Sequence, residues 1–244
     1  MKAFPAKSCE PLTEAELVGN GLVAAMRTAY GKLAAKMLTS DAVALYRSRQ
    51  AAFGKKVLTE ADASAVEAPL VLYTGLAGRL DEMLGAELRE QRHVSFSWRS
   101  CWEPAEKPAQ HHDAKVEQAA ALFNLSAAWS LRGALPPRND SEAIKAAARH
   151  FQLAAGALQA VEKLVAEGGI AEDIDLSDGA LGALRALMLA QAQACFCEKA
   201  EQDGLGASTQ LKLCLGAKQL YTQASDAFGP LKGQKKLTAW GAGG

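Results

Sequence analysis

The sequence predicts an all-α protein, an elongated tetratricopeptide-like solenoid of antiparallel helical hairpins with one short extended segment near residues 93–99. Strong helix formers, mainly Ala, Leu, Glu, Gln and Lys, dominate the chain, and glycine and proline interrupt them at intervals. Helices of about 20 residues joined by short connections pack as antiparallel hairpins. No clean repeat of about 34 residues is present, so a regular tetratricopeptide array is not expected.

The composition excludes several classes of protein. Hydrophobic residues make up 49% of the 244 residues and charged residues 22%, which is typical of a globular chain. Lys plus Arg and Asp plus Glu both number 27, so no overall charge favours binding to nucleic acid. The N-terminus lacks the apolar core of a signal peptide, and no stretch approaches 18 uncharged apolar residues. We therefore expect a cytoplasmic protein with reduced cysteines.

Capping signals mark the first helices. Thr13 with Glu16, and Thr59 with Asp62, have the spacing of a capping box, in which each residue caps a backbone N–H of the other. After the third helix, Val94, Phe96 and Trp98 alternate with polar residues, a period that predicts an extended segment. The predicted helices span about 13–30, 36–53, 59–88, 110–133, 140–167, 177–202 and 207–228.

Phe196 is out of place in the helix that carries it. On a helical wheel of about 100° per residue it lies near Leu189 and within about 60° of Arg185 and Lys199. Either a neighbouring helix covers this face, or Leu189 and Phe196 form an exposed apolar patch between cations, suited to an acidic amphipathic helix. The predicted buried face lies on the other side of the helix and contains Leu184, Leu187, Gln191, Ala194 and Cys195, with Met188 at its edge.

Five segments resemble a known family. In order they are "FSW", "VEQAAALFNLSAAWS", "ARHFQLAAGALQAVEKL", "DLSDGALGALRALMLAQAQACFCEKA" and "LYTQA". Their order and spacing are similar to those of the Bro-one domain of Alix, rhophilin and related ESCRT-associated proteins. The resemblance is strongest over residues 70–228. It implies that residues 1–244 form a single Bro-one-like domain that lacks the C-terminal part of the usual domain.

The resemblance also implies a function. In that family a hydrophobic patch holds the C-terminal amphipathic helix of an ESCRT-III subunit, which brings a non-enzymatic adaptor from the cytoplasm to endosomes. Position by position, Phe196 matches an aromatic residue of the patch, and Thr209 and Leu213 fall where the next helix adds apolar residues. Thr209 departs from the larger aliphatic residue that is usual there. Leu213 could instead be core, with Leu211 and Leu215 pointing outward.

Two function classes therefore remain, an ESCRT-III adaptor or a generic helical interaction module that has lost this partner. An enzyme is not expected, because the chain has no nucleophile elbow, Walker loop or HExxH motif. Neither a metal nor a cofactor is expected. His111 and His112 point about 100° apart if helical, and Cys195 and Cys197 about 200° apart, so neither pair has the geometry of a metal site.

Overall fold

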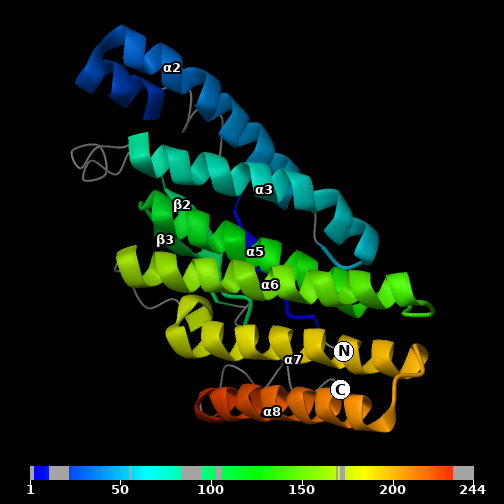
Figure 1. Ribbon diagram of the computed structural model, residues 1–244. Coiled ribbons are helices and arrows are strands. Elements are labelled where there is room, and N and C mark those ends of the chain that lie inside the picture. Colours follow the sequence, from blue (N-terminus) through cyan, green and yellow to red (C-terminus); the bar gives the residue numbers. More distant parts are fainter. Residues whose placement is uncertain are drawn as a thin grey trace.

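The computed structural model describes residues 3–10, 22–54, 57–83, 95–102, 106–168, 170 and 174–232. Long helices lie side by side in chain order, and each packs against the next (Figure 1). This arrangement confirms the predicted all-α solenoid of antiparallel hairpins. The helices are α2 (Leu22–Phe53), α3 (Glu60–Met83), α5 (Ala114–Ala134), α6 (Ser141–Gly168), α7 (Asp178–Gln202) and α8 (Ala207–Lys232), with a 3₁₀ turn, η1 (Ile174–Leu176).

A small antiparallel sheet crosses behind α5 in this view (Figure 1). Its strands are β1 (Ser8–Cys9), β2 (Phe96–Arg99) and β3 (Ala109–His111), in that order across the sheet. The extended segment predicted near 93–99 is confirmed at β2, whose Phe96 and Trp98 side chains are each 1% exposed. The sequence did not predict the two strands that pair with it.

The predicted start of a helix near residue 110 is wrong. The backbone of Ala109–His111 pairs with β2 instead, and α5 begins at Ala114. The side chain of Asp113 caps this helix by accepting the Lys115 N–H at 2.8 Å. His111 therefore lies in a strand and is half-buried, and the helical geometry assumed for His111 and His112 does not apply.

The other helix ends agree more closely with the sequence. The capping box at α3 is formed as predicted, because the Thr59 N–H donates to Asp62 at 3.0 Å and the Asp62 N–H donates to Thr59 at 3.1 Å. The box at Thr13 and Glu16 lies outside the described residues. The predicted gap after residue 30 appears as a kink in α2 at Gly31, whose φ of 87° lies in the region that favours glycine.

The largest apolar cluster joins α5, α6 and α7 to the N-terminal segment. Phe4 packs edge-to-face on Phe123 of α5, with ring centroids 5.3 Å apart. The same segment is hydrogen-bonded to α5, since the Lys7 N–H donates to Asn124 Oδ1 at 2.7 Å and the Phe4 N–H donates to Ser130 Oγ at 3.2 Å. The N-terminal segment therefore covers one side of the helix array.

One helix within the described residues, Gly179–Gln202, is long and apolar enough to cross a membrane by length and composition alone. Half of its most apolar window is buried inside the fold. Many apolar residues of α7, among them Leu181, Leu184 and Met188, therefore serve as core residues of the array in this structure.

Candidate partner-binding surface on α7 and α8

The helix that carries Phe196, α7, has a capped N-terminus. Ser177 caps the helix by accepting the Ala180 N–H. Most of the predicted inward face is confirmed, because Leu184, Met188 and Cys195 are fully buried and Gln191 is 1% exposed. Leu187 and Ala194, which complete the predicted face, are half-buried.

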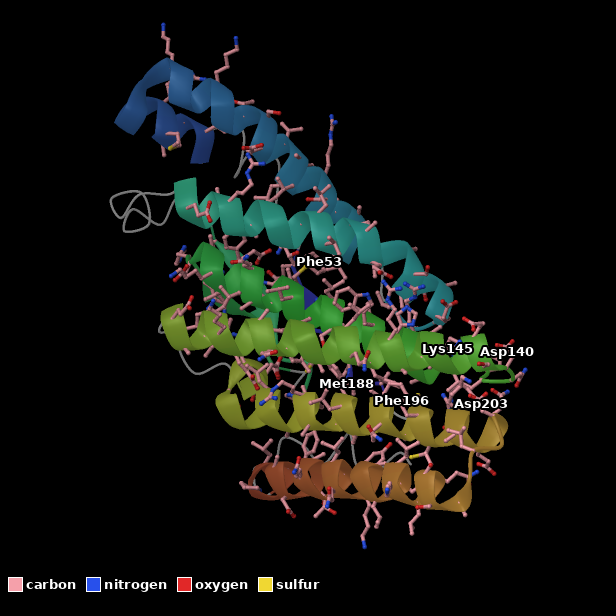
Figure 2. All side chains as sticks on the ribbon, in the orientation of Figure 1. Phe53, Asp140, Lys145, Met188, Phe196 and Asp203 are labelled. Carbon is pink, nitrogen blue, oxygen red and sulfur yellow. The ribbon has the colours of Figure 1, made fainter. Side chains whose placement is uncertain are left out.

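Phe196 is 40% exposed, the largest value for any apolar side chain of α7 within the described residues. No neighbouring helix therefore covers it fully, and Figure 2 marks its position in the C-terminal half of α7. Leu189 is only half-buried and packs against the main core cluster. The face that the wheel isolated thus consists of one exposed aromatic ring beside a partly buried leucine.

The two cations near Phe196 already have carboxylate partners. Arg185 Nε lies 3.0 Å from Glu162 Oε1 of α6, and its side chain remains 39% exposed. Lys199 pairs with Asp203, the C-cap residue that follows α7, and the Lys199 side chain is 20% exposed. Because such pairs are partly solvated, each cation retains room for a further acceptor, but its charge is locally balanced.

The next helix adds Thr209 and Leu213. Thr209 is exposed in the first turn of α8, and Leu213 is half-buried one turn later. Gln193 links the two helices, because its Nε2 donates to the Leu213 carbonyl oxygen at 3.4 Å. Leu211 and Leu215 are 61% and 49% exposed, which confirms the expectation that they are the outward leucines of α8.

Phe196, Leu189, Thr209 and Leu213, flanked by Arg185 and Lys199, define what we term the α7–α8 surface. Sequence reasoning missed Gln193 and Gly216, which lie where the two helices meet. A Cβ built on Gly216 would lie 3.6 Å from Gln193 Nε2, an ordinary van der Waals distance, which places Gly216 directly beside Gln193. Gln193 lies about 60° from Phe196 on the wheel, a signal that could have identified it.

A group of side chains that could hold a metal ion is not assembled in the described residues. No cluster of three or more His, Cys, Asp or Glu side chains forms there. Cys195 and Cys197 face different surroundings, the first fully buried and the second half-buried. Burial raises the pKa of the Cys195 thiol to about 11, so that thiol stays protonated at neutral pH.

Comparison with known proteins identifies the scaffold. The model of the BRO1-like domain family matches residues 5–240. Curated relatives include the ALG-2 interacting protein X of Dictyostelium discoideum, 30% identical over 145 residues, and the vacuolar-sorting protein BRO1 of Arabidopsis thaliana, 33% identical over 144 residues. These matches cover 59% and 57% of the chain but only 18% and 17% of the relatives.

A third relative carries an enzyme name. It is the mouse tyrosine-protein phosphatase non-receptor type 23, 31% identical over 139 residues. The match covers 57% of the chain and 8% of that protein. The chain therefore spans less than a fifth of the length of each of these three curated relatives. A match to 8% of the phosphatase does not assign phosphatase activity to this chain.

Solved structures show the same fold. One described as an ALIX BRO1 CHMP4C complex matches with a TM-score of 0.81 at 22% identity, covering 98% of this chain and 66% of that one. Another, described as the structural basis for endosomal targeting by the Bro1 domain, matches with a TM-score of 0.75 at 16% identity, covering 98% and 62%. At these identities the likeness concerns the arrangement of the helices.

Proposed function

Because the chain belongs to the BRO1-like domain family, we propose that it is a non-enzymatic adaptor that binds the C-terminal amphipathic helix of an ESCRT-III subunit. The α7–α8 surface is the binding site in this proposal. The observation that carries it is the 40% exposure of Phe196 on a helix whose other large apolar residues are buried or half-buried. An exposed aromatic ring in such a setting is suited to anchor a partner.

The comparisons support the class of partner. One structural neighbour is described as a complex of the ALIX BRO1 domain with CHMP4C, and another concerns endosomal targeting by the Bro1 domain. In the proposed function this chain acts likewise in endosomal sorting and membrane remodelling, recruited from the cytoplasm to endosomes. It reaches the membrane only through its partners, and it needs no cofactor and no nucleic acid.

Binding would depend mainly on apolar contacts. An amphipathic helix presents apolar side chains at positions i, i+3, i+4 and i+7, which can pack over Phe196 and Leu213. Since Arg185 and Lys199 are already paired with Glu162 and Asp203, they would contribute little net attraction to an acidic partner. We therefore expect affinity to depend weakly on salt.

One observation favours the second candidate function, a generic helical interaction module that has lost the ESCRT-III partner. Thr209 is exposed where the resemblance to the family implies a larger aliphatic residue. A hydroxyl at this position makes the apolar area smaller and places a polar group at its edge. A partner with a different apolar pattern would then be preferred.

The experiment measures binding of the C-terminal helix of CHMP4C, as a fluorescent peptide, to wild-type protein and to Phe196→Asp. An anchor residue contributes about 2 kcal/mol or more, so the variant should bind at least about thirtyfold more weakly. The thermal unfolding temperature should change little, because a 40% exposed side chain leaves no cavity when replaced.

Leu211→Asp is the matched control. It places the same charge on an apolar residue that is 61% exposed on α8 and outside the α7–α8 surface, so it should leave peptide binding unchanged. A large loss of stability in Phe196→Asp would instead make Phe196 a core residue. If the wild-type chain does not bind the peptide at high micromolar concentration, the generic module replaces the adaptor.

A further inference from the structure

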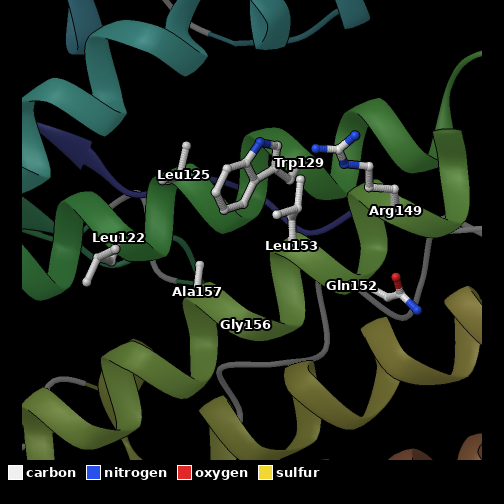
Figure 3. A pocket seen from close by; sticks show the side chains of 8 residues that line it. All are labelled: Leu122, Leu125, Trp129, Arg149, Gln152, Leu153, Gly156 and Ala157. Carbon is white, nitrogen blue, oxygen red and sulfur yellow. The ribbon is translucent and has the colours of Figure 1, made fainter.

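A second open apolar surface lies between α5 and α6, apart from the α7–α8 surface (Figure 3). It is a groove of about 380 Å³, and most of its wall is hydrocarbon. Within the described residues it shares no side chain with the α7–α8 surface. The residues that line it are Leu122, Leu125 and Trp129 from α5, and Arg149, Gln152, Leu153, Gly156 and Ala157 from α6.

Small residues of α6 keep the groove open. Gly156 is exposed, and a Cβ built on it would meet no atom within 4 Å, so the space above it is empty. Ala157, the next residue, fills little of the groove. The opposite wall is taller because Trp129 presents an indole ring there, as Figure 3 shows. A protruding side chain from a partner can therefore enter above Gly156 and pack against this ring.

The indole ring itself is held by packing. Trp129 is partly buried against the main core cluster, and its Nε1 has no hydrogen-bond partner among the described residues. The position of the ring is therefore set by its apolar contacts with the core.

One end of the groove carries an available positive charge. Arg149 is exposed and forms no ion pair within the part of the chain that the structure describes. The two acidic residues beside it are both engaged, since Glu67 pairs with Arg132 and Glu142 pairs with Lys145 at 2.7 Å. Arg149 is thus available, at this end of the groove, to pair with a carboxylate of a partner protein.

His150 lies at the same end and is affected by the charge of Arg149. Its pKa is lowered from the ordinary value, first by partial burial and then by the positive charges of Arg132 and Arg149. Glu60 acts in the opposite direction but does not overcome them. A carboxylate that entered here would be attracted to the same charges.

From the groove's shape and charge we propose that it docks an acidic amphipathic helix from a partner protein. Leu122 and Trp129 are seven residues apart on α5, a rise of about 10 Å, which matches two turns of a ligand helix. Apolar side chains at i, i+4 and i+7 of the ligand pack between Leu122, Leu153 and Trp129. A glutamate or aspartate one turn beyond the last of them meets Arg149.

The probe is a fluorescent synthetic helix of about 18 residues, five turns, with leucines at i, i+4 and i+7 and a glutamate one turn beyond. It is titrated against the 244-residue chain carrying Phe196→Asp, so that the anchor of the α7–α8 surface is removed. Gly156→Phe fills the groove and should weaken binding by at least about tenfold. This substitution should not unfold the protein, because it meets open space on a helix and replaces a poor helix former.

Gly75→Phe is the matched control for bulk. Gly75 is also exposed on a helix, α3, with nothing within 4 Å of its built Cβ, but it does not line the groove. Binding by this variant should equal that of the parent chain. Equal binding by the Gly156→Phe and parent chains, or no binding of the probe to the parent chain, would overturn the proposal.

The charge is tested separately. Arg149→Gln should weaken binding about three- to tenfold, as expected for loss of one charged contact at a partly exposed site. Lys163→Gln removes a cation from the same helix outside the groove and should have no effect. A probe with glutamine in place of glutamate should bind the parent and Arg149→Gln chains equally, and if Arg149→Gln still weakens its binding, a carboxylate is not what Arg149 recognises.

Discussion

At the scale of single residues, one buried carboxylate organises the first half of the helix array. Glu117 of α5, 1% exposed, accepts hydrogen bonds from Arg49 of α2, Tyr73 of α3 and Trp98 of β2. Burial raises the pKa of Tyr73 well above its usual value, and the nearby Glu117 carboxylate raises it further. Tyr73 therefore remains a neutral donor throughout the physiological range.

Trp98 is the member of this network whose removal tests the fold most directly. Trp98→Ala should lower the free energy of unfolding by about 3–5 kcal/mol, because it leaves a cavity and removes a donor from Glu117. Trp98→Phe fills most of the space and should cost less. Urea unfolding measures both, and a loss under about 1 kcal/mol in Trp98→Ala would contradict the burial of this side chain.

At the scale of elements, the helices differ in how much of their surface is covered. α5 is packed between α3 and α6 and is buried along most of its length. In contrast, the buried residues of α8 within the described part of the chain are Ala217, Ala224 and Leu231. Among the described elements α8 packs substantially on α7 alone, and two of its leucines, Leu211 and Leu215, point outward.

This asymmetry predicts the order of local opening. Amide hydrogen exchange should be faster in α8 than in α5, α6 or α7, and slowest in α5, because local opening costs least where few apolar contacts are lost. The measurement compares peptides from residues 207–228 with peptides from 114–134. Uniform protection across 70–228 would show that α8 is held as firmly as the interior helices.

At the scale of the whole molecule, an ion pair joins parts of the chain that are far apart in sequence. Lys7 Nζ lies 2.6 Å from Asp175 Oδ2, and both side chains are fully buried although 168 residues separate them. Asp175, in η1, also accepts from Ser100 Oγ at 2.7 Å and from the Cys101 N–H at 2.8 Å. The N-terminal segment, the chain after β2 and the start of α7 are thereby held together.

Breaking this pair from one side should be costly. Asp175→Leu leaves a buried ammonium group without its carboxylate and should reduce the free energy of unfolding by about 3–5 kcal/mol. The double variant Lys7→Met with Asp175→Leu should lose less, because no uncompensated charge remains. Urea unfolding of both variants checks this, and a double variant that is less stable than Asp175→Leu would contradict it.

The sequence by itself determined the elements with strong local signals. Residue composition and periodicity were enough to predict the helices. In α6 and α7 the apolar residues that pack on neighbouring helices recur at helical spacing. The reciprocal bonds of Thr59 and Asp62 depend on residues three apart, and the alternation of Phe96 and Trp98 on neighbours in one strand. Local signals also placed Phe196 opposite the buried face of α7.

Only the tertiary structure decided the features that depend on distant segments. Ala109–His111 forms a strand because β2 offers backbone partners, which no local pattern reveals. The exposure of Phe196, the linkage of Gln193 to α8 and the open groove above Gly156 depend on how far neighbouring helices cover a given face. A wheel gives the direction of a side chain from its own helix, whereas exposure is set by the packing of other helices around it.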